Sequence, residues 1–261
     1  MSCPRYRPFR YHLCQRAGVL SLGLFLVAWE LIPHLSEQTA YFVAPPSTVL
    51  RTFWELARTG ELLQHVSISF ARAIGGLVLA AFVGVPLGVL LGGWFPLFER
   101  AVNPVLRLLG EINPFSLFPL FMIFFGIGET SKCAMIFWVS LWPILFNTMT
   151  GVRGVDPAYV KTARSMGAGL GTLLLRVVLP GASPLILNGL KIGAGTSFFM
   201  LIAAEMIGAS AGLGWLVWNA QITYQIPKLF AATVAISVLG LLLNGFFTLI
   251  ERRALSWRDA G

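Results

Sequence analysis

Long segments with few charged residues constrain this chain more than any other feature of its sequence. Five of them approach or reach the roughly 20 residues that a helix needs to cross a bilayer. They cover residues 19–32, 68–93, 115–128, 185–207 and 230–250. A mean hydropathy of +0.77 excludes an ordinary soluble domain. A further span, with more polar residues, is expected at 134–150. We therefore predict an all-α polytopic membrane protein with about six transmembrane helices, five being the alternative.

The basic residues beside these segments predict the orientation. Four arginines precede residue 17, four basic residues lie between 153 and 176, and three arginines follow residue 251. Such a bias places both termini in the cytoplasm and requires an even number of spans. We divide the chain into a cytoplasmic tail (1–16), one transmembrane domain (17–255) with a cytoplasmic loop (152–180), and a second tail (256–261). A cleaved signal peptide is the alternative for the first apolar segment.

Composition also excludes several function classes. The formal net charge of +8 would suit a nucleic-acid-binding protein, but the basic residues are scattered between apolar segments, so we expect no nucleic acid partner. Cys3, Cys14 and Cys133 are too few and too far apart for a disulfide framework or a metal cluster. The chain has no Gly-rich phosphate loop, no H-E-x-x-H and no G-x-S-x-G motif, so we expect no catalytic residue, metal or cofactor in it.

Two further segments have the patterns of surface and packing helices. Pro46 to Gly60 predicts an amphipathic helix along the outer membrane surface or a simple connector, with Arg51 and Glu55 four residues apart on its polar side. From Gly76 to Gly92 every fourth residue is Gly or Ala. Such a row lets a second helix approach closely, within the chain or in another subunit.

A basic, partly polar island separates two apolar segments over residues 156–180. Asp156 followed by a proline predicts a helix start, and Gly167 predicts its end. Tyr159, Ala163 and Met166 share one face of this short helix, which needs a partner surface.

After a second short apolar helix, Pro180 predicts a sharp change of direction. The two short helices would together form an angled bracket.

Ionisable and polar residues in the spans are candidates for a transport path. Arg107 and Glu111 could line it or pair with each other on one helix face. The proline-interrupted segment from Asn113 to Pro119, with Phe115, exposes backbone groups, which are tolerated only where protein or a water-filled cavity receives them, and we place this segment near the path.

Asn147 could contact substrate or bond a neighbouring helix, the commoner role. Glu205 could serve a gate, contact another helix or indicate a cationic substrate. Trp215, Trp218 and Gln221 lie in an uncharged external loop suited to a protein contact.

At the island, K-T-A-R-S-M-G, nine residues and V-x-L-P resemble the signature loop of permease subunits of bacterial ABC importers. The family pattern is Glu-Ala-Ala, three residues, Gly, nine residues and Ile-x-Leu-Pro. Lys161 and the threonine after it depart from this pattern, and valine replaces its isoleucine. Around the island, APPSTVL, FGIGETSK, WPILFNTMTGVRGVDP and GLGWLVWNAQ are similar to the branch that imports nitrate, sulfonates, taurine or bicarbonate.

The resemblance implies a type I importer permease in the bacterial plasma membrane that offers alternating access to a small solute. Expected partners are two ATP-binding subunits, which hold ATP and Mg, an external solute-binding protein and a second permease copy, most simply an identical one. The bracket would be the coupling helix that docks on the ATPase. The residues that would carry this contact are Tyr159, Lys161, Ala163, Arg164, Met166, Gly167, Leu179 and Pro180.

Substrate and class leave alternatives open. A small anion is expected from the resemblance, and a thiamine precursor or another small organic solute is the alternative within the importer class. An ATP-independent secondary transporter and an intramembrane enzyme are alternatives from other classes, and neither accounts for the bracket.

Overall fold

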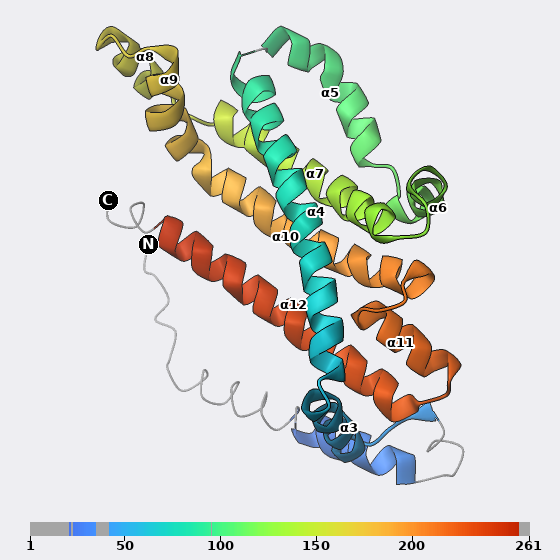
Figure 1. The fold of residues 1–261 in the computed structure, drawn as a ribbon. Helices are drawn as coiled ribbons and strands as arrows, with labels where there is room; N and C mark the ends of the chain where they lie inside the picture. Colours follow the sequence, from blue (N-terminus) through green and yellow to red (C-terminus); the bar gives the residue numbers. More distant parts are fainter. Residues whose placement is uncertain (1–20, 22, 35–41, 95, 256–261) are drawn as a thin grey trace, which may run out of the picture. The chain divides into compact units, whose positions relative to one another are not determined.

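The computed structural model describes residues 21, 23–34, 42–94 and 96–255, and these contain helices and no strand. Figure 1 shows these helical elements and labels α3 to α12. In chain order they are η1 (Ile32–His34), α3 (Pro46–Arg58), α4 (Glu61–Val89), η2 (Leu90–Trp94), α5 (Pro96–Gly110), α6 (Pro114–Phe125), α7 (Glu129–Arg153), α8 (Pro157–Ser165), α9 (Leu170–Leu173), η3 (Leu174–Val178), α10 (Leu179–Gly208), α11 (Leu213–Ile222) and α12 (Ile226–Ala254). The predicted all-α fold is confirmed.

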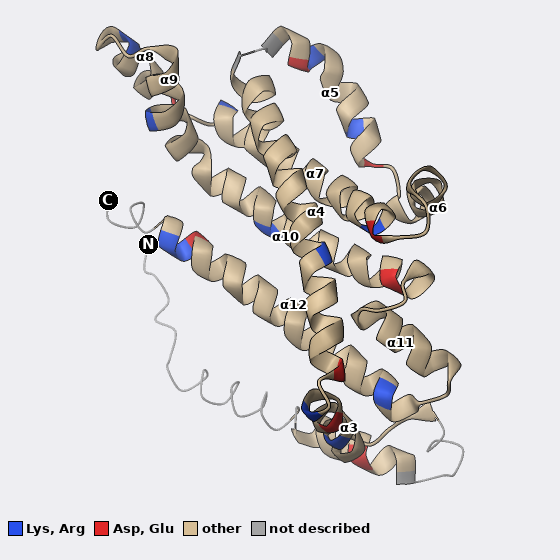
Figure 2. Cartoon of the chain, viewed as in Figure 1, with Lys and Arg blue, Asp and Glu red and all other residues tan. Residues whose placement is uncertain are grey.

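Four helical stretches of the described chain are long and apolar enough to cross a membrane: Glu61–Gly93, Glu129–Arg153, Leu170–Gly208 and Ile226–Ala254. A fifth span is possible where Leu97–Gly110 and Pro114–Phe125 meet at 89°. The predicted first span, 19–32, lies partly outside the described residues, and both predicted tails lie outside them. Figure 2 shows how few charged residues these long helices carry between their ends.

The described chain divides into two compact units. The first contains residues up to 62 together with 217–234. Its helix α3 begins at Pro46 and ends before Gly60, whose φ of +79° is readily adopted only by glycine. Arg51 Nε donates to Glu55 Oε1 at 3.1 Å, so the predicted i, i+4 pair is formed.

In the second unit, residues 63–216 with those from 235 onward, the small-residue row of α4 packs against α7. A Cβ on Gly76 would lie 2.5 Å from Ile136 Cγ2, and one on Gly88 would lie 2.6 Å from Thr148 Cβ. No side chain larger than hydrogen fits there without movement. The row is therefore a packing surface within the chain, one of the two roles that its spacing allows.

The predicted change of direction at Pro180 is wrong. Residues Leu170–Gly208 run on as one helical stretch without a bend above 40°. Pro180 lies in the first turn of α10, directly after the π-helical turn η3. The wider turn alters the hydrogen-bond register at the position where proline lacks an N–H group, so the helical path continues.

Candidate transport and coupling sites

The short helix α8 is closed at both ends by its own residues. Asp156 Oδ1 accepts a hydrogen bond from Ala158 N at 2.8 Å, which confirms the predicted N-cap. At the other end Gly167 has a φ of +78°, and Ala168 N donates to Ala163 O at 3.0 Å. Gly167 N also donates to Arg164 O at 3.0 Å. These two bonds form a Schellman motif, which ends the helix at the predicted glycine.

The side chains of α8 are available to a partner. The helix has no buried residue, Tyr159 is 68% exposed and Met166 is 82% exposed. Ala163 is half-buried, while Lys161 and Arg164 are exposed. Figure 1 shows α8 and α9 at the end of α10.

The last two predicted coupling residues lie at the base of this segment. Leu179 packs against the buried cluster of Val89, Val152 and Ala182, while Pro180 is exposed. Six of the eight predicted coupling residues thus lie in the exposed segment 159–167, and the other two lie at the start of α10.

The break between α5 and α6 brings three predicted path residues together. Asn113 Oδ1 accepts from Phe115 N at 2.9 Å and caps α6, whose first residue is a proline. Glu111, Asn113 and Phe115 line a cavity of about 620 Å³. Its opposite wall comes from Val139 of α7 and from Gly195, Thr196, Phe199 and Met200 of α10. A broken span beside a cavity is the arrangement that the prolines predicted.

Arg107 does not pair with Glu111. Its Nε donates to Asn103 Oδ1 at 2.7 Å, and its guanidinium carbon lies 5.9 Å from the centre of the Phe146 ring. The helical register still reaches Glu111, since Glu111 N donates to Arg107 O at 3.1 Å, but the Arg107 side chain is bonded to Asn103, one turn earlier. Arg107 also lies outside the lining of the cavity that contains Glu111.

Asn147 forms a contact between helices. Its Oδ1 accepts from Asn188 Nδ2 of α10 at 3.1 Å, and its own Nδ2 donates to Pro143 O at 2.8 Å. Interhelical bonding is the commoner of the two roles open for an asparagine in a span.

Glu205 is fully buried in a polar network of α4, α7 and α10. Arg72 Nη1 donates to Glu205 Oε1 at 2.7 Å and to Ala211 O at 2.7 Å. The same guanidinium forms a two-pronged ion pair with Glu129, and Lys132 lies 3.6 Å from Glu129. Two basic and two acidic side chains therefore balance each other, which compensates for their removal from water. Glu205 faces its helix neighbours and does not stand isolated.

The same network caps the N-terminus of α11. Leu213 N donates to Ser69 Oγ at 2.9 Å, and Gly214 N donates to Glu205 Oε2 at 2.9 Å. Ser69 Oγ itself lies 2.8 Å from the Glu205 carboxylate. The first N–H groups of a helix lack partners within it, so α4 and α10 supply the cap. Gly212, with a φ of +126°, leaves no room for a side chain against that carboxylate.

The predicted external loop is thus largely the helix α11. Trp215 packs against His65, with ring centres 5.3 Å apart. Trp218 is 43% exposed and Gln221 is exposed. Trp218 and Gln221 keep the accessibility that a protein contact needs, while Trp215 is partly covered by its own chain.

Sequence reasoning missed Ser69, Arg72, Glu129 and Asn188. Arg72 had a recognisable signal, because it stands inside an apolar span where an unpaired charge is costly. Its acidic partners lie 57 and 133 residues away, so spacing along the chain could not identify them. In the described part of the chain, no group of three or more His, Cys, Asp or Glu could hold a metal ion.

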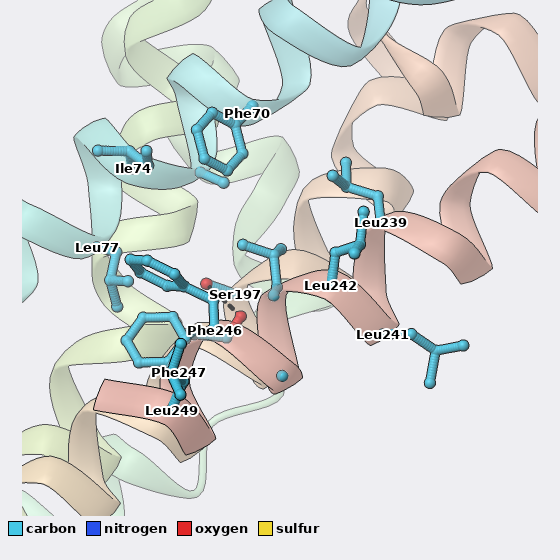
Figure 3. Close-up of a pocket in the computed structure, with 14 residues that line it drawn as sticks. Phe70, Ile74, Leu77, Ser197, Leu239, Leu241, Leu242, Phe246, Phe247 and Leu249 are labelled. Carbon is cyan, nitrogen blue, oxygen red and sulfur yellow. Dashed lines mark hydrogen bonds between the residues drawn. The ribbon is translucent and has the colours of Figure 1, made fainter. Parts of the chain in front are cut away.

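A second cavity has the wrong chemistry for a small anion. It measures about 600 Å³ and lies between α4, α10 and α12 in the second unit. Figure 3 shows leucine and phenylalanine side chains around it, with Ser197 beside them. The Ser197 hydroxyl donates to Ala194 O at 2.9 Å, so the one polar side chain is already engaged. Apolar walls offer no donors to a charged solute.

Comparison with known proteins places these features in a family context. The profile of the family described as "binding-protein-dependent transport system inner membrane component" matches residues 84–256. An aliphatic sulfonates transport permease protein of Bacillus subtilis is 33% identical and covers 98% of this chain and 92% of its own. The taurine transport system permease protein of Escherichia coli is 32% identical over 91% of this chain and 88% of its own. The nitrate import permease protein of a Synechocystis strain is 27% identical over 89% and 86%.

Solved structures show the same fold. A chain of the MetNI methionine ABC transporter, from a study of its inward-facing conformations, matches with a TM-score of 0.66 at 21% identity. That match covers 74% of this chain and 95% of the other. An amino acid ABC transporter matches with a TM-score of 0.59 at 17% identity, covering 77% and 98%.

Proposed function

Because this chain belongs to the family of binding-protein-dependent transport system inner membrane components, we propose that it is the membrane subunit of an ATP-driven importer for a small sulfonate or a similar small anion. The sulfonate and taurine relatives carry this proposal, because they align with nearly the whole chain. The nitrate relative is also named for an oxyanion.

The partner set follows from the same family. We infer two ATP-binding subunits that hold ATP and Mg, an external binding protein that delivers the solute, and a second permease copy, most simply an identical one. Both termini would face the cytoplasm, which puts α8 on the side of the ATPase. The exposed face of Tyr159, Ala163 and Met166 supports a docking role, because α8 has its own caps at both ends and no buried side chain.

The network around Glu205 bears on the substrate charge. An isolated acidic residue would favour a cationic solute such as a thiamine precursor. Arg72 lies 2.7 Å from Glu205 and balances its charge, which removes that argument. An anionic substrate is therefore compatible with this residue.

The decisive experiment is co-expression with the ATP-binding subunits and the binding protein, followed by uptake of labelled taurine and ethanesulfonate into proteoliposomes. We expect Ala163→Glu and Gly167→Asp to abolish both copurification of the ATPase and ATP-dependent uptake. Ser165→Glu, on the opposite face of α8, is the matched control and retains both. Uptake that is independent of ATP, or unchanged in Ala163→Glu and Gly167→Asp, would identify a secondary transporter instead.

A further inference from the structure

A basic cavity lies along α5, from Glu99 to Arg107, and reaches the C-terminal end of α7. It measures about 680 Å³. Its lining comprises Gly92, Glu99, Arg100, Asn103, Pro104, Arg107 and Arg153. Three arginines and one glutamate give this lining a formal charge of +2, which is 3 minus 1. By the predicted orientation this end of the second unit faces the cytoplasm.

The one carboxylate of this cavity is already occupied. Glu99 is 2% exposed and accepts from Arg153 Nη2 and from Asn103 Nδ2. Asn103 Oδ1 in turn accepts from Arg107 Nε at 2.7 Å. This chain of contacts orients the Arg107 side chain while leaving its two terminal nitrogens without a hydrogen bond to the described residues.

A second guanidinium stands on the same side of the helix. Arg100 and Arg107 are seven residues apart on α5, two turns along one face. Arg100 forms no ion pair with any residue that the structure describes. Arg100 and Arg107 therefore both line the cavity without an ion pair to a described carboxylate. The third arginine of the lining, Arg153, pairs with Glu99.

Guanidinium groups bind oxyanions through paired N–H donors, and they do so more specifically than a lysine ammonium. The cavity is large enough for a small organic anion. Two arginines that only kept the surface soluble would need neither a cavity beside them nor the contacts with the buried Glu99 and with Asn103 that orient Arg107.

We propose that Arg100 and Arg107 bind the oxyanion group of a ligand in this cavity. Sulfonate as the ligand rests on the proposed function, since the transported solute would meet these arginines as it leaves toward the cytoplasm. The phosphate of an anionic lipid has the same chemistry and is the other possible source of the group.

The test uses the full-length chain in nanodiscs of phosphatidylcholine and equilibrium dialysis with ³⁵S-labelled ethanesulfonate. We expect saturable binding that weakens about tenfold in Arg100→Gln and in Arg107→Gln, because each removes charged hydrogen-bond donors. Arg107→Lys keeps the charge and loses less. Arg58→Gln, at an exposed arginine far along the chain, is the control and binds like the original chain.

A second set of nanodiscs contains added phosphatidylglycerol and separates the two sources of the oxyanion. Loss of ethanesulfonate binding there assigns the arginines to a lipid headgroup, and retained binding assigns them to a free solute. The site is ruled out if the Arg100→Gln, Arg107→Gln double variant matches the original chain in both lipids, or if neither binds in phosphatidylcholine.

Uptake by the complete transporter distinguishes this proposal from the proposed function. Intact sulfonate uptake without binding at the arginines would refute this site and leave the importer function standing. If the complex transports only uncharged solutes but still binds the oxyanion, the proposed substrate is refuted and the proposed binding site stands.

Discussion

Arg72 Nη1 lies 2.7 Å from Glu205 Oε1, and the Glu205 side chain is fully buried. The same guanidinium binds Glu129, so residues of α4, α7 and α10 share one cation. Removing that cation would leave a buried carboxylate without its counter-charge.

We expect Arg72→Met to lower the free energy of unfolding by about 3–5 kcal/mol, as for other broken buried pairs. Unfolding in mixed detergent, followed by circular dichroism, measures the change. The exposed pair of Arg51 and Glu55 provides the control, since its side chains are 82% and 60% exposed. Arg51→Met should cost less than about 1 kcal/mol. Equal losses at both positions would contradict a structural role for the Arg72 network.

Neighbouring glycines of α4 separate packing from helix propensity. A Cβ at Gly76 would lie 2.5 Å from Ile136, whereas one at Gly75 would meet nothing within 4 Å. We therefore expect Gly76→Ala to destabilise the protein by about 1–3 kcal/mol through overpacking, with Gly75→Ala neutral or mildly stabilising. Thermal unfolding of the two variants in one detergent decides the matter, and a Gly75→Ala loss as large as that of Gly76→Ala would refute the packing argument.

Ser69 provides a test of the cap on α11. Its hydroxyl accepts from Leu213 N, and Ser69→Ala would leave that N–H buried without an acceptor, at a cost of about 1–3 kcal/mol. Amide hydrogen exchange of residues 213–217 should accelerate. Ser67, exposed and bonded within its own helix to Gln64 O, is the matched position for a Ser67→Ala control. Unchanged protection in Ser69→Ala would show that α11 does not depend on this cap.

The start of α8 depends on Asp156. Asp156→Ala should weaken the helix by about 1 kcal/mol, because Ala158 N loses its acceptor. Exchange of the amides of residues 158–162 would rise several-fold, while Asp156→Asn retains an oxygen acceptor and most of the protection. If alanine and asparagine behave alike, the cap is not what holds the helix.

Local signals explain why much of the fold could be predicted. Apolar length predicted the spans in α4, α10 and α12, and the proline at the start and glycine at the end of α3 and α8 predicted both boundaries within a residue or two. These features act within one helical turn, so they can be recognised in the sequence without knowledge of the tertiary structure.

The failures have a common physical origin. Pro180 does not turn the chain because the preceding π-helical turn accommodates it, and Arg107 misses Glu111 because its side chain is bonded to Asn103, one turn earlier in α5. Ser69 and Arg72, which bind Glu205, lie on another helix, so the spacing of residues along one helix could not identify them. The coupling role of the α8 residues and the transport role of the cavity beside Asn113 stay predictions until function is measured.

The cap of α11 limits what can be exchanged between related transporters. A chimera that received only residues 209–222 from a relative would place a new helix start against Ser69 and Glu205 of the recipient. Any side chain at position 212 would collide with that carboxylate. The smallest transplantable piece is therefore discontinuous in sequence, since the segment must travel together with Ser69, Arg72 and Glu205.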